Sequence, residues 1–136
     1  MTAGIEPTVR ASEQDRYRLI TLKGRTGIKT WYGVIRPALA VSLSDPAPPL
    51  VRDVVTDSSL EIAWGTFGGR WADVWLALLQ QRAHTDGLDP QSREDLQYTL
   101  NIHVARGIGR LTGNRACHSP EGMARLVLGL LNGEAS

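Results

Sequence analysis

Residues Arg70–Arg82 have the sequence RWADVWLALLQQR, which offers more apolar area at helical spacing than any other window of the chain. The apolar positions follow the pattern i, i+3, i+4, i+7 and i+8, and they are Trp71, Val74, Trp75, Leu78 and Leu79. This spacing places side chains on one face of a helix. Because burial of apolar surface contributes roughly 25 cal/mol per Å², we expect this face to dominate the core. The sequence predicts a central helix over residues 69–83 with both tryptophans inside.

The residues that precede this helix predict short β-strands. Two segments rich in β-branched and aromatic residues, Tyr17–Leu22 and Ile28–Arg36, flank a turn at residues 24–27 and predict a β-hairpin. Pro37 cannot donate a backbone hydrogen bond, and the alternation of apolar and polar residues after it, at 38–44, predicts a third strand. A proline-rich connector follows at 45–50. Residues 60–67 would add a fourth strand and residues 51–55 a weaker fifth one.

Two further helices are predicted by their start signals. Asp89–Pro90 and Ser119–Pro120 each combine an N-capping oxygen with a proline, which loses nothing at the first helical position. Helical spacing of apolar residues then extends these helices to about residue 111 and about residue 132. Gly107, inside the first of them, predicts a close approach of a neighbouring helix.

The order of elements, strands first and helices second, predicts an α+β domain. Its N-terminal antiparallel sheet would have three to five short strands within about residues 16–67. Three C-terminal helices, at about 69–83, 90–111 and 120–132, would cover this sheet. Residues 1–15 show no period and predict a flexible N-terminal tail, so the single domain would span residues 16–136.

Composition fits one globular domain and excludes several classes of protein. The chain has 136 residues, of which 42% are hydrophobic, enough for a single core. The longest nearly unbroken apolar run, Val74–Leu79, is far shorter than the ~20 residues that span a bilayer, and residues 1–15 resemble no secretory signal. Cys117 is the only cysteine, which excludes an intramolecular disulfide. We therefore expect a cytoplasmic protein with no membrane association and no cofactor.

Charged side chains are segregated along the chain although the formal net charge is only +1. Residues 16–44 and 96–120 carry Lys and Arg without any Asp or Glu, whereas the acidic residues gather at 45–61 and 73–95. This segregation predicts a folded protein with one basic and one acidic side.

The first candidate binding segment is basic and interleaved with aromatic residues. Cationic side chains neutralise phosphates and aromatic rings stack on unpaired bases, a combination typical of single-strand binders. The members of this segment are Arg16, Arg18, Lys23, Arg25, Lys29, Trp31, Tyr32 and Arg36. The alternative is a hairpin whose charges keep its edge in solution while its aromatic rings face the core.

The second candidate is a polar row on the helix predicted at 90–111. Thr99, His103, Arg106 and Arg110 follow one another at spacings of four, three and four residues, and Arg115 follows just beyond. Such a row suits phosphates or an acidic partner surface. The alternative is a solvated stripe whose arginines are favoured near a helix C-terminus by the macrodipole.

Catalytic and metal-binding motifs are weak in this sequence. Cys117 and His118 are neighbours whose side chains point apart, whereas structural zinc needs four spaced donors. His84 lies in a turn rich in Asp, and the cluster of carboxylates and hydroxyls at Asp53–Glu61 has no matched base. The glycine-rich segment at 107–113 lacks the spacing of a nucleotide-binding loop. We therefore predict no catalytic residue and no metal ligand.

Three functions remain open. The preferred hypothesis is a small non-enzymatic binding or inhibitory protein that acts on another protein or complex, of the kind that bacterial, phage or plasmid accessory genes encode. Four Trp and three Tyr exceed what a small core readily hides, which favours an interface, and a homodimer through a sheet edge or the last helix would bury part of it. The alternative is a protein that binds DNA or RNA through both basic segments. The third is a small hydrolase that uses His84 or the Asp53–Glu61 cluster.

Overall fold

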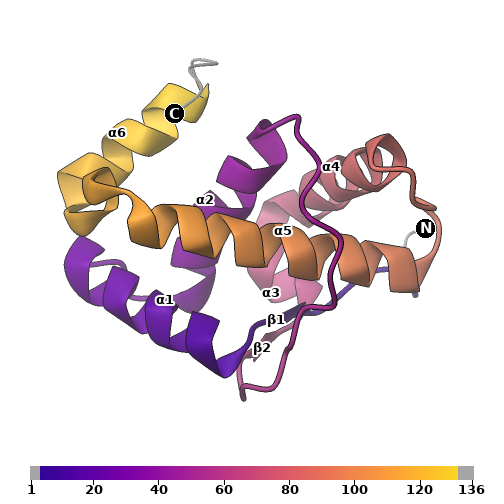
Figure 1. Cartoon of the computed structure of the whole chain (residues 1–136), viewed down its shortest axis with the longest axis horizontal. Coiled ribbons are helices and arrows are strands. Elements are labelled where there is room, and N and C mark those ends of the chain that lie inside the picture. Colours follow the sequence, from indigo (N-terminus) through magenta and orange to yellow (C-terminus); the bar gives the residue numbers. More distant parts are fainter. Residues whose placement is uncertain (1–3, 132–136) are drawn as a thin grey trace.

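The computed structural model describes residues 4–131, and helices make up most of this range (Figure 1). In chain order the elements are β1 (Val9–Arg10), α1 (Glu13–Thr26), α2 (Trp31–Ser44), β2 (Glu61–Ile62), α3 (Trp64–Gly68), the 3-10 turn η1 (Gly69–Trp71), α4 (Ala72–Thr85), α5 (Arg93–Gly113), the 3-10 turn η2 (Arg115–His118) and α6 (Pro120–Leu131). The N-terminal half is therefore helical. The predicted α+β fold, with its sheet of three to five strands, is wrong.

Local capping explains why α1 and α2 form where the sequence predicts strands. The Ser12 side chain accepts a hydrogen bond from the Asp15 backbone N–H at 3.0 Å, and the Thr30 side chain accepts one from Gly33 at 3.1 Å. Such N-cap bonds satisfy free donors in the first helical turn. Gly27 then ends α1 in the left-handed conformation, with φ at 76°. The strands predicted at 17–22, 28–36 and 38–44 thus lie mostly within helices.

The sheet found between residues 4 and 131 has two strands of two residues each. β1 and β2 pair antiparallel, with Val9 opposite Ile62 and Arg10 opposite Glu61. β1 lies inside the segment predicted as a flexible tail, yet Val9 is fully buried. Residues 51–55 form no strand, and the strand predicted at 60–67 is reduced to β2 because α3 begins directly after it.

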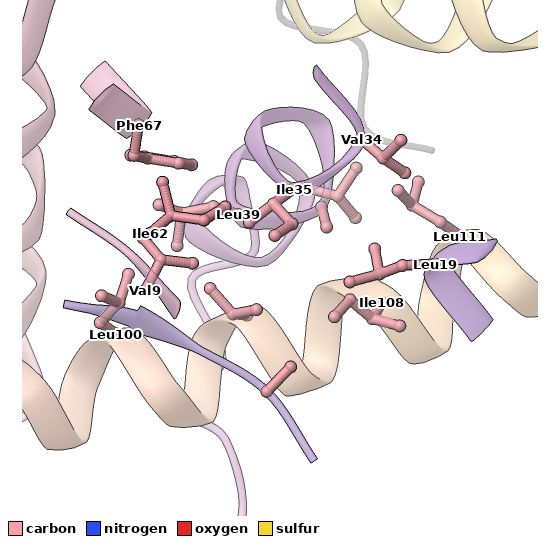
Figure 2. Packing of buried hydrophobic residues seen from close by; sticks show 14 of the residues in the cluster. Val9, Leu19, Val34, Ile35, Leu39, Ile62, Phe67, Leu100, Ile108 and Leu111 are labelled. Carbon is pink, nitrogen blue, oxygen red and sulfur yellow. The ribbon is translucent and has the colours of Figure 1, made fainter. Parts of the chain in front are cut away.

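α5 is the central element of the core. α2 packs most extensively against it, and α1 and α4 pack against it as well. Figure 2 shows side chains of α5 in one cluster with those of β1, α1, α2 and α3, including Val9 near Leu100 and Leu19 near Ile108. A Cβ added at Gly107 would overlap the backbone carbonyl of Ala38, so α2 and α5 cross in direct contact there. The close approach predicted at Gly107 is confirmed.

α4 occupies nearly the predicted range, but a different face of it is buried. The residues that face the core are Leu76, Leu79 and Ala83. The residues that face solvent are Trp71, Val74 and Leu78, which are 57%, 52% and 50% exposed. Trp75 is half-buried, and its ring packs edge-on against Phe67 with centroids 5.4 Å apart. The prediction that both tryptophans lie in the core is therefore wrong for Trp71.

The other two C-terminal helices lie near their predicted ranges. Ser92 caps α5 by accepting a hydrogen bond from the Asp95 N–H at 3.2 Å, whereas Asp89 caps the preceding turn through the Gln91 N–H at 2.9 Å. Ser119 accepts the Gly122 N–H at 3.0 Å, which confirms the start signal predicted before Pro120. Residue 132, within the predicted last helix, lies outside the described residues.

Candidate nucleic-acid interface

Two cations of α1 meet the first residue of α2 at the corner between these helices. Arg16 and Lys23 are about two helical turns apart and so lie on one face of α1. The Lys23 ammonium is 4.1 Å from the centroid of the Trp31 ring, and the Arg16 guanidinium is 5.7 Å from it. Cation–π attraction at these distances is favourable. The half-buried Trp31 therefore holds the Lys23 and Arg16 cations near the surface, and Arg16 is also paired with the Glu13 carboxylate at 3.4 Å.

The same corner borders a shallow hollow of 430 Å³. Its α1–α2 side is formed by Lys23, Lys29, Thr30, Trp31 and Tyr32. α2 has no acidic residue in its first turn, so the positive end of its dipole is not neutralised locally. Glu61 lines the opposite side of the hollow and is paired with Arg10 at 2.9 Å. We call Arg16, Lys23, Lys29, Trp31 and Tyr32 the basic corner.

The other cations of the first predicted segment have different surroundings. Arg18 and Arg25 follow Arg16 and Lys23 by two residues, which is more than half a turn around the helix, so they lie on another face of α1. Arg18 pairs with Asp15 at 2.9 Å, and Arg25 is exposed. Arg36 is fixed in place, because it donates to the Phe67 carbonyl at 2.7 Å and lies 4.6 Å over the Tyr32 ring. The helical fold thus separates cations that the hairpin prediction places together.

The second predicted row lies mostly in a buried network. His103 is 0% exposed, with Nδ1 at 2.8 Å from the Ser42 hydroxyl and Nε2 at 3.1 Å from the Asp86 carboxylate. Arg106 donates to the Ser42 hydroxyl at 2.8 Å and to the Ala47 carbonyl at 2.7 Å. In this structure His103 has no access to a ligand, and Arg106 holds the end of α2 and the loop that follows it.

Arg82 of α4, which no sequence pattern points to, completes this network. Its buried guanidinium donates to the backbone carbonyls of Asp45 at 2.6 Å and Ala47 at 2.9 Å. It also donates to the Asp86 carboxylate at 3.1 Å. The i, i+4 spacing of Arg82 and Asp86 is visible in the sequence, but the distant carbonyl partners are not. We call Ser42, Arg82, Asp86, His103 and Arg106 the buried network.

The hydrogen bonds of the buried network fit a neutral His103. The Ser42 hydroxyl accepts from Arg106 Nε, so its own proton is free to donate to His103 Nδ1, and Nε2–H then donates to Asp86. Burial lowers the pKa of His103 below its usual 6.5, and the hydrogen bond with Asp86 opposes this shift. Within the described residues, no buried side-chain nitrogen or oxygen lacks a hydrogen bond.

Ser42, His103 and Asp86 are the residue types of a hydrolase triad, but this arrangement is structural. A nucleophilic serine needs access to its substrate and an oxygen that is free to attack. Ser42 and His103 are both 0% exposed, and the Ser42 oxygen already accepts from Arg106.

Side chains of the Asp53–Glu61 cluster, the candidate site for a hydrolase, form hydrogen bonds with backbone groups. Asp57 accepts the Glu13 N–H at 3.0 Å, and Ser58 donates to the Ala11 carbonyl at 2.7 Å. Both hydrogen bonds hold the loop between α2 and β2 against the start of α1. His84, the other candidate for a hydrolase, is exposed at the end of α4. Between residues 4 and 131, no three side chains of His, Cys, Asp or Glu gather as a metal ion would require.

Arg110 and Arg115 lie at the far end of α2 from the basic corner. Arg110 pairs with Asp45 at 2.6 Å, directly after the last turn of α2. Both arginines line a hollow of 780 Å³ together with residues of α2 and α6. Trp31 and Asp45 mark the two ends of α2, whose 14 residues span about 20 Å. Arg110 therefore lies near the opposite end of α2 from Trp31.

Residues 8–119 match a known protein family, described as DNA sulphur modification protein DndE. The chain belongs to the DndE family. The matched range runs from just before β1 to just after η2, and it contains every residue of the two predicted binding segments. No curated protein matches the chain with significance.

Membership of the DndE family places this chain among DNA sulphur modification proteins, which agrees with the predicted accessory role in general terms. For this DndE-family protein, direct binding to DNA, binding to another protein, an inhibitory role and a homodimer all stay predictions. Among the described residues of this DndE-family chain, no helix is both long enough and apolar enough to cross a bilayer.

Proposed function

We propose that this protein is a non-catalytic component of DNA sulphur modification that binds DNA through the basic corner. One observation carries the proposal: Lys23 and Lys29 lie at the start of α2 and have no ion pair among residues 4–131, while Arg16 beside them is paired with Glu13 at 3.4 Å. Glu61, the acidic residue at this hollow, is already paired with Arg10. The family description favours DNA as the partner that these cations would meet.

The basic corner suits the phosphates of DNA better than its bases. The Trp31 ring already has the Lys23 ammonium over it, and the Tyr32 ring has the Arg36 guanidinium over it. Rings covered by a cation of the protein are less available to stack on unpaired bases. Surface Lys and Arg side chains neutralise phosphates whatever the base sequence. We therefore propose contact with the DNA backbone that does not depend on sequence.

A titration of a short fluorescein-labelled DNA duplex at several salt concentrations tests this function. The binding constant of the wild type should fall linearly with salt on logarithmic axes, because phosphate binding releases counterions. The double variant Lys23→Ala/Lys29→Ala should weaken binding about tenfold at low salt. It should also reduce the salt slope by about two, which corresponds to one phosphate contact per lysine.

The matched control removes two exposed arginines elsewhere, Arg93→Ala on α5 and Arg125→Ala on α6. This control lowers the net charge by the same amount, so general electrostatic attraction falls equally in both double variants. Thermal melting of each variant verifies that the fold is intact. An equal loss of duplex affinity in the two double variants would show that the basic corner is not the DNA site. The same conclusion would follow if the wild-type binding constant did not change with salt concentration.

A further inference from the structure

A groove lies between the proline-rich loop and the N-terminal half of α5. Figure 1 shows this loop, which follows α2, crossing α5 on its way to β2. The groove has a volume of 460 Å³, and every charged residue that lines it is acidic. The loop contributes Pro48, Pro49 and Val51 to its walls, and α5 contributes Glu94, Tyr98 and Ile102. We call it the acidic groove.

We propose that the acidic groove binds a segment of a partner protein in which an aliphatic side chain stands next to Lys or Arg. The aliphatic side chain would enter the groove, and the cation would pair with the Glu94 carboxylate at the rim of the groove. This inference goes beyond the proposed DNA binding, because it uses other residues and the opposite charge.

Exposed apolar side chains on the loop that walls the groove favour a protein partner. Leu50 and Val51 are 86% and 91% exposed. Large apolar side chains exposed next to a hollow are typical of interaction sites. Ile102, at 3% exposed, provides an apolar surface inside the groove. An aliphatic side chain of the partner would remove both this surface and the Val51 side chain from water.

The loop wall of the groove is held in place before any partner binds. Arg82 donates to the carbonyls of Asp45 and Ala47, and Arg106 also donates to Ala47. Pro48 and Pro49 further restrict the backbone that follows. A wall fixed in advance loses little conformational entropy when a ligand binds.

Glu94 provides the available negative charge at the rim. It is exposed in the first turn of α5 and has no ion pair within residues 4–131. The other lining acids are engaged, since Asp95 accepts the Asp89 N–H at 2.8 Å and Asp86 is shared by members of the buried network. A partner cation would therefore pair with Glu94, whereas DNA phosphates would be repelled there.

Three fluorescein-labelled peptides of equal length test the proposal by fluorescence polarisation. One alternates Arg with Leu, one alternates Glu with Leu, and one alternates Arg with Ser. The Arg–Leu peptide should bind about tenfold more tightly than either of the others, because it alone offers both charge and apolar contact. Glu94→Lys should weaken its binding about tenfold, and Val51→Ser about fivefold.

The matched controls are Glu121→Lys, at an exposed acid of α6, and Val55→Ser, at a 61% exposed position of the same loop. Neither residue lines the groove, so both variants should bind the Arg–Leu peptide as the wild type does. Equal losses in variants and controls, or equal binding of the Glu–Leu peptide, would overturn the proposal. Loss of duplex binding in Glu94→Lys would also overturn the proposal. Glu94 repels DNA phosphates, so its replacement by Lys should not lower the affinity for DNA.

Discussion

His103 connects three helices through two hydrogen bonds, one to Ser42 on α2 and one to Asp86 at the end of α4. Both bonds suit a neutral imidazole. Protonation would add a positive charge in a buried position that already lies near Arg82 and Arg106, and both of these lower the pKa of His103 in addition to burial. The charge state of this one side chain is therefore linked to the stability of the fold.

Stability should decrease as the pH falls below about 6.5. In the unfolded chain His103 titrates near its usual pKa of 6.5, whereas in the folded protein its pKa is lower. Between these two values the unfolded chain binds more protons, so the contribution is complete above 6.5 and is lost as the pH falls. Urea denaturation across this window should show a falling free energy of unfolding for the wild type. His103→Gln should show a flatter profile that starts about 1–3 kcal/mol lower.

The control for this pH profile is His84→Gln, at an exposed position on α4. It should reproduce the wild-type slope. Titration of Asp45 does not contribute to this pH profile. The hydrogen bonds from the Ala47 backbone N–H and from Arg110 lower the pKa of Asp45 below 3.8, outside the pH range in which His103 titrates. Equal slopes for the wild type and His103→Gln would contradict the assignment of His103 as the titrating group.

Helix formation in the N-terminal half reflects packing that β propensity does not capture. The β-branched and aromatic residues at 17–22 and 28–36 favour strands by an amount that spans only ~1 kcal/mol on host scales. Complete burial of a side chain such as Leu19 or Leu39 contributes about 1.5–3 kcal/mol. The capping signals at Ser12 and Thr30 are readable in the sequence. The choice of helix over strand also depends on contacts with α5, which the sequence does not display.

Apolar spacing predicted the C-terminal helices to within a few residues, and the Ser119–Pro120 start signal is confirmed for α6. The Asp89–Pro90 start signal is wrong, because Ser92 caps α5. Spacing alone did not reveal which face of α4 is buried, since Leu76, Leu79 and Ala83 repeat at helical intervals much as Trp71 and Val74 do. In the candidate site, too, the sequence predicts some features and not others. The charge pattern singles out Lys23 and Lys29 of the basic corner as candidates, whereas the backbone partners of Arg82 lie too far away in the sequence to be inferred.

The crossing of α2 and α5 can be tested with two glycines on one helix. Gly107→Ala should destabilise the protein by about 1–3 kcal/mol, because its Cβ would overlap the Ala38 backbone and the helices would have to separate. Gly109→Ala should stabilise it by about 0.5–1 kcal/mol, since no atom lies within 4 Å of the added Cβ and alanine favours helix. Urea denaturation of both variants measures these changes. A Gly107→Ala variant that is as stable as the wild type would exclude the close crossing.

Across the whole molecule, α2 connects the two proposed sites. Its N-terminus forms part of the basic corner, and its C-terminus leads into the loop that walls the acidic groove. The buried network fixes that loop relative to α4 and α5. The charge segregation seen along the sequence thus corresponds to two proposed sites of opposite sign, and such an arrangement would suit a protein that links DNA to a protein partner.

If the two sites are independent, variants at each should affect one ligand and spare the other. Lys23→Ala/Lys29→Ala should weaken duplex binding about tenfold and leave binding of the Arg–Leu peptide intact, and Glu94→Lys should do the reverse. The triple variant should show both losses within about 0.5 kcal/mol of additivity, as distant sites do. Each ligand is measured separately, because a cationic peptide binds DNA directly. Removal of two lysines lowers the positive charge and should, if anything, tighten binding of a cationic peptide. Weaker peptide binding in the lysine variant would therefore mean that both ligands contact one surface.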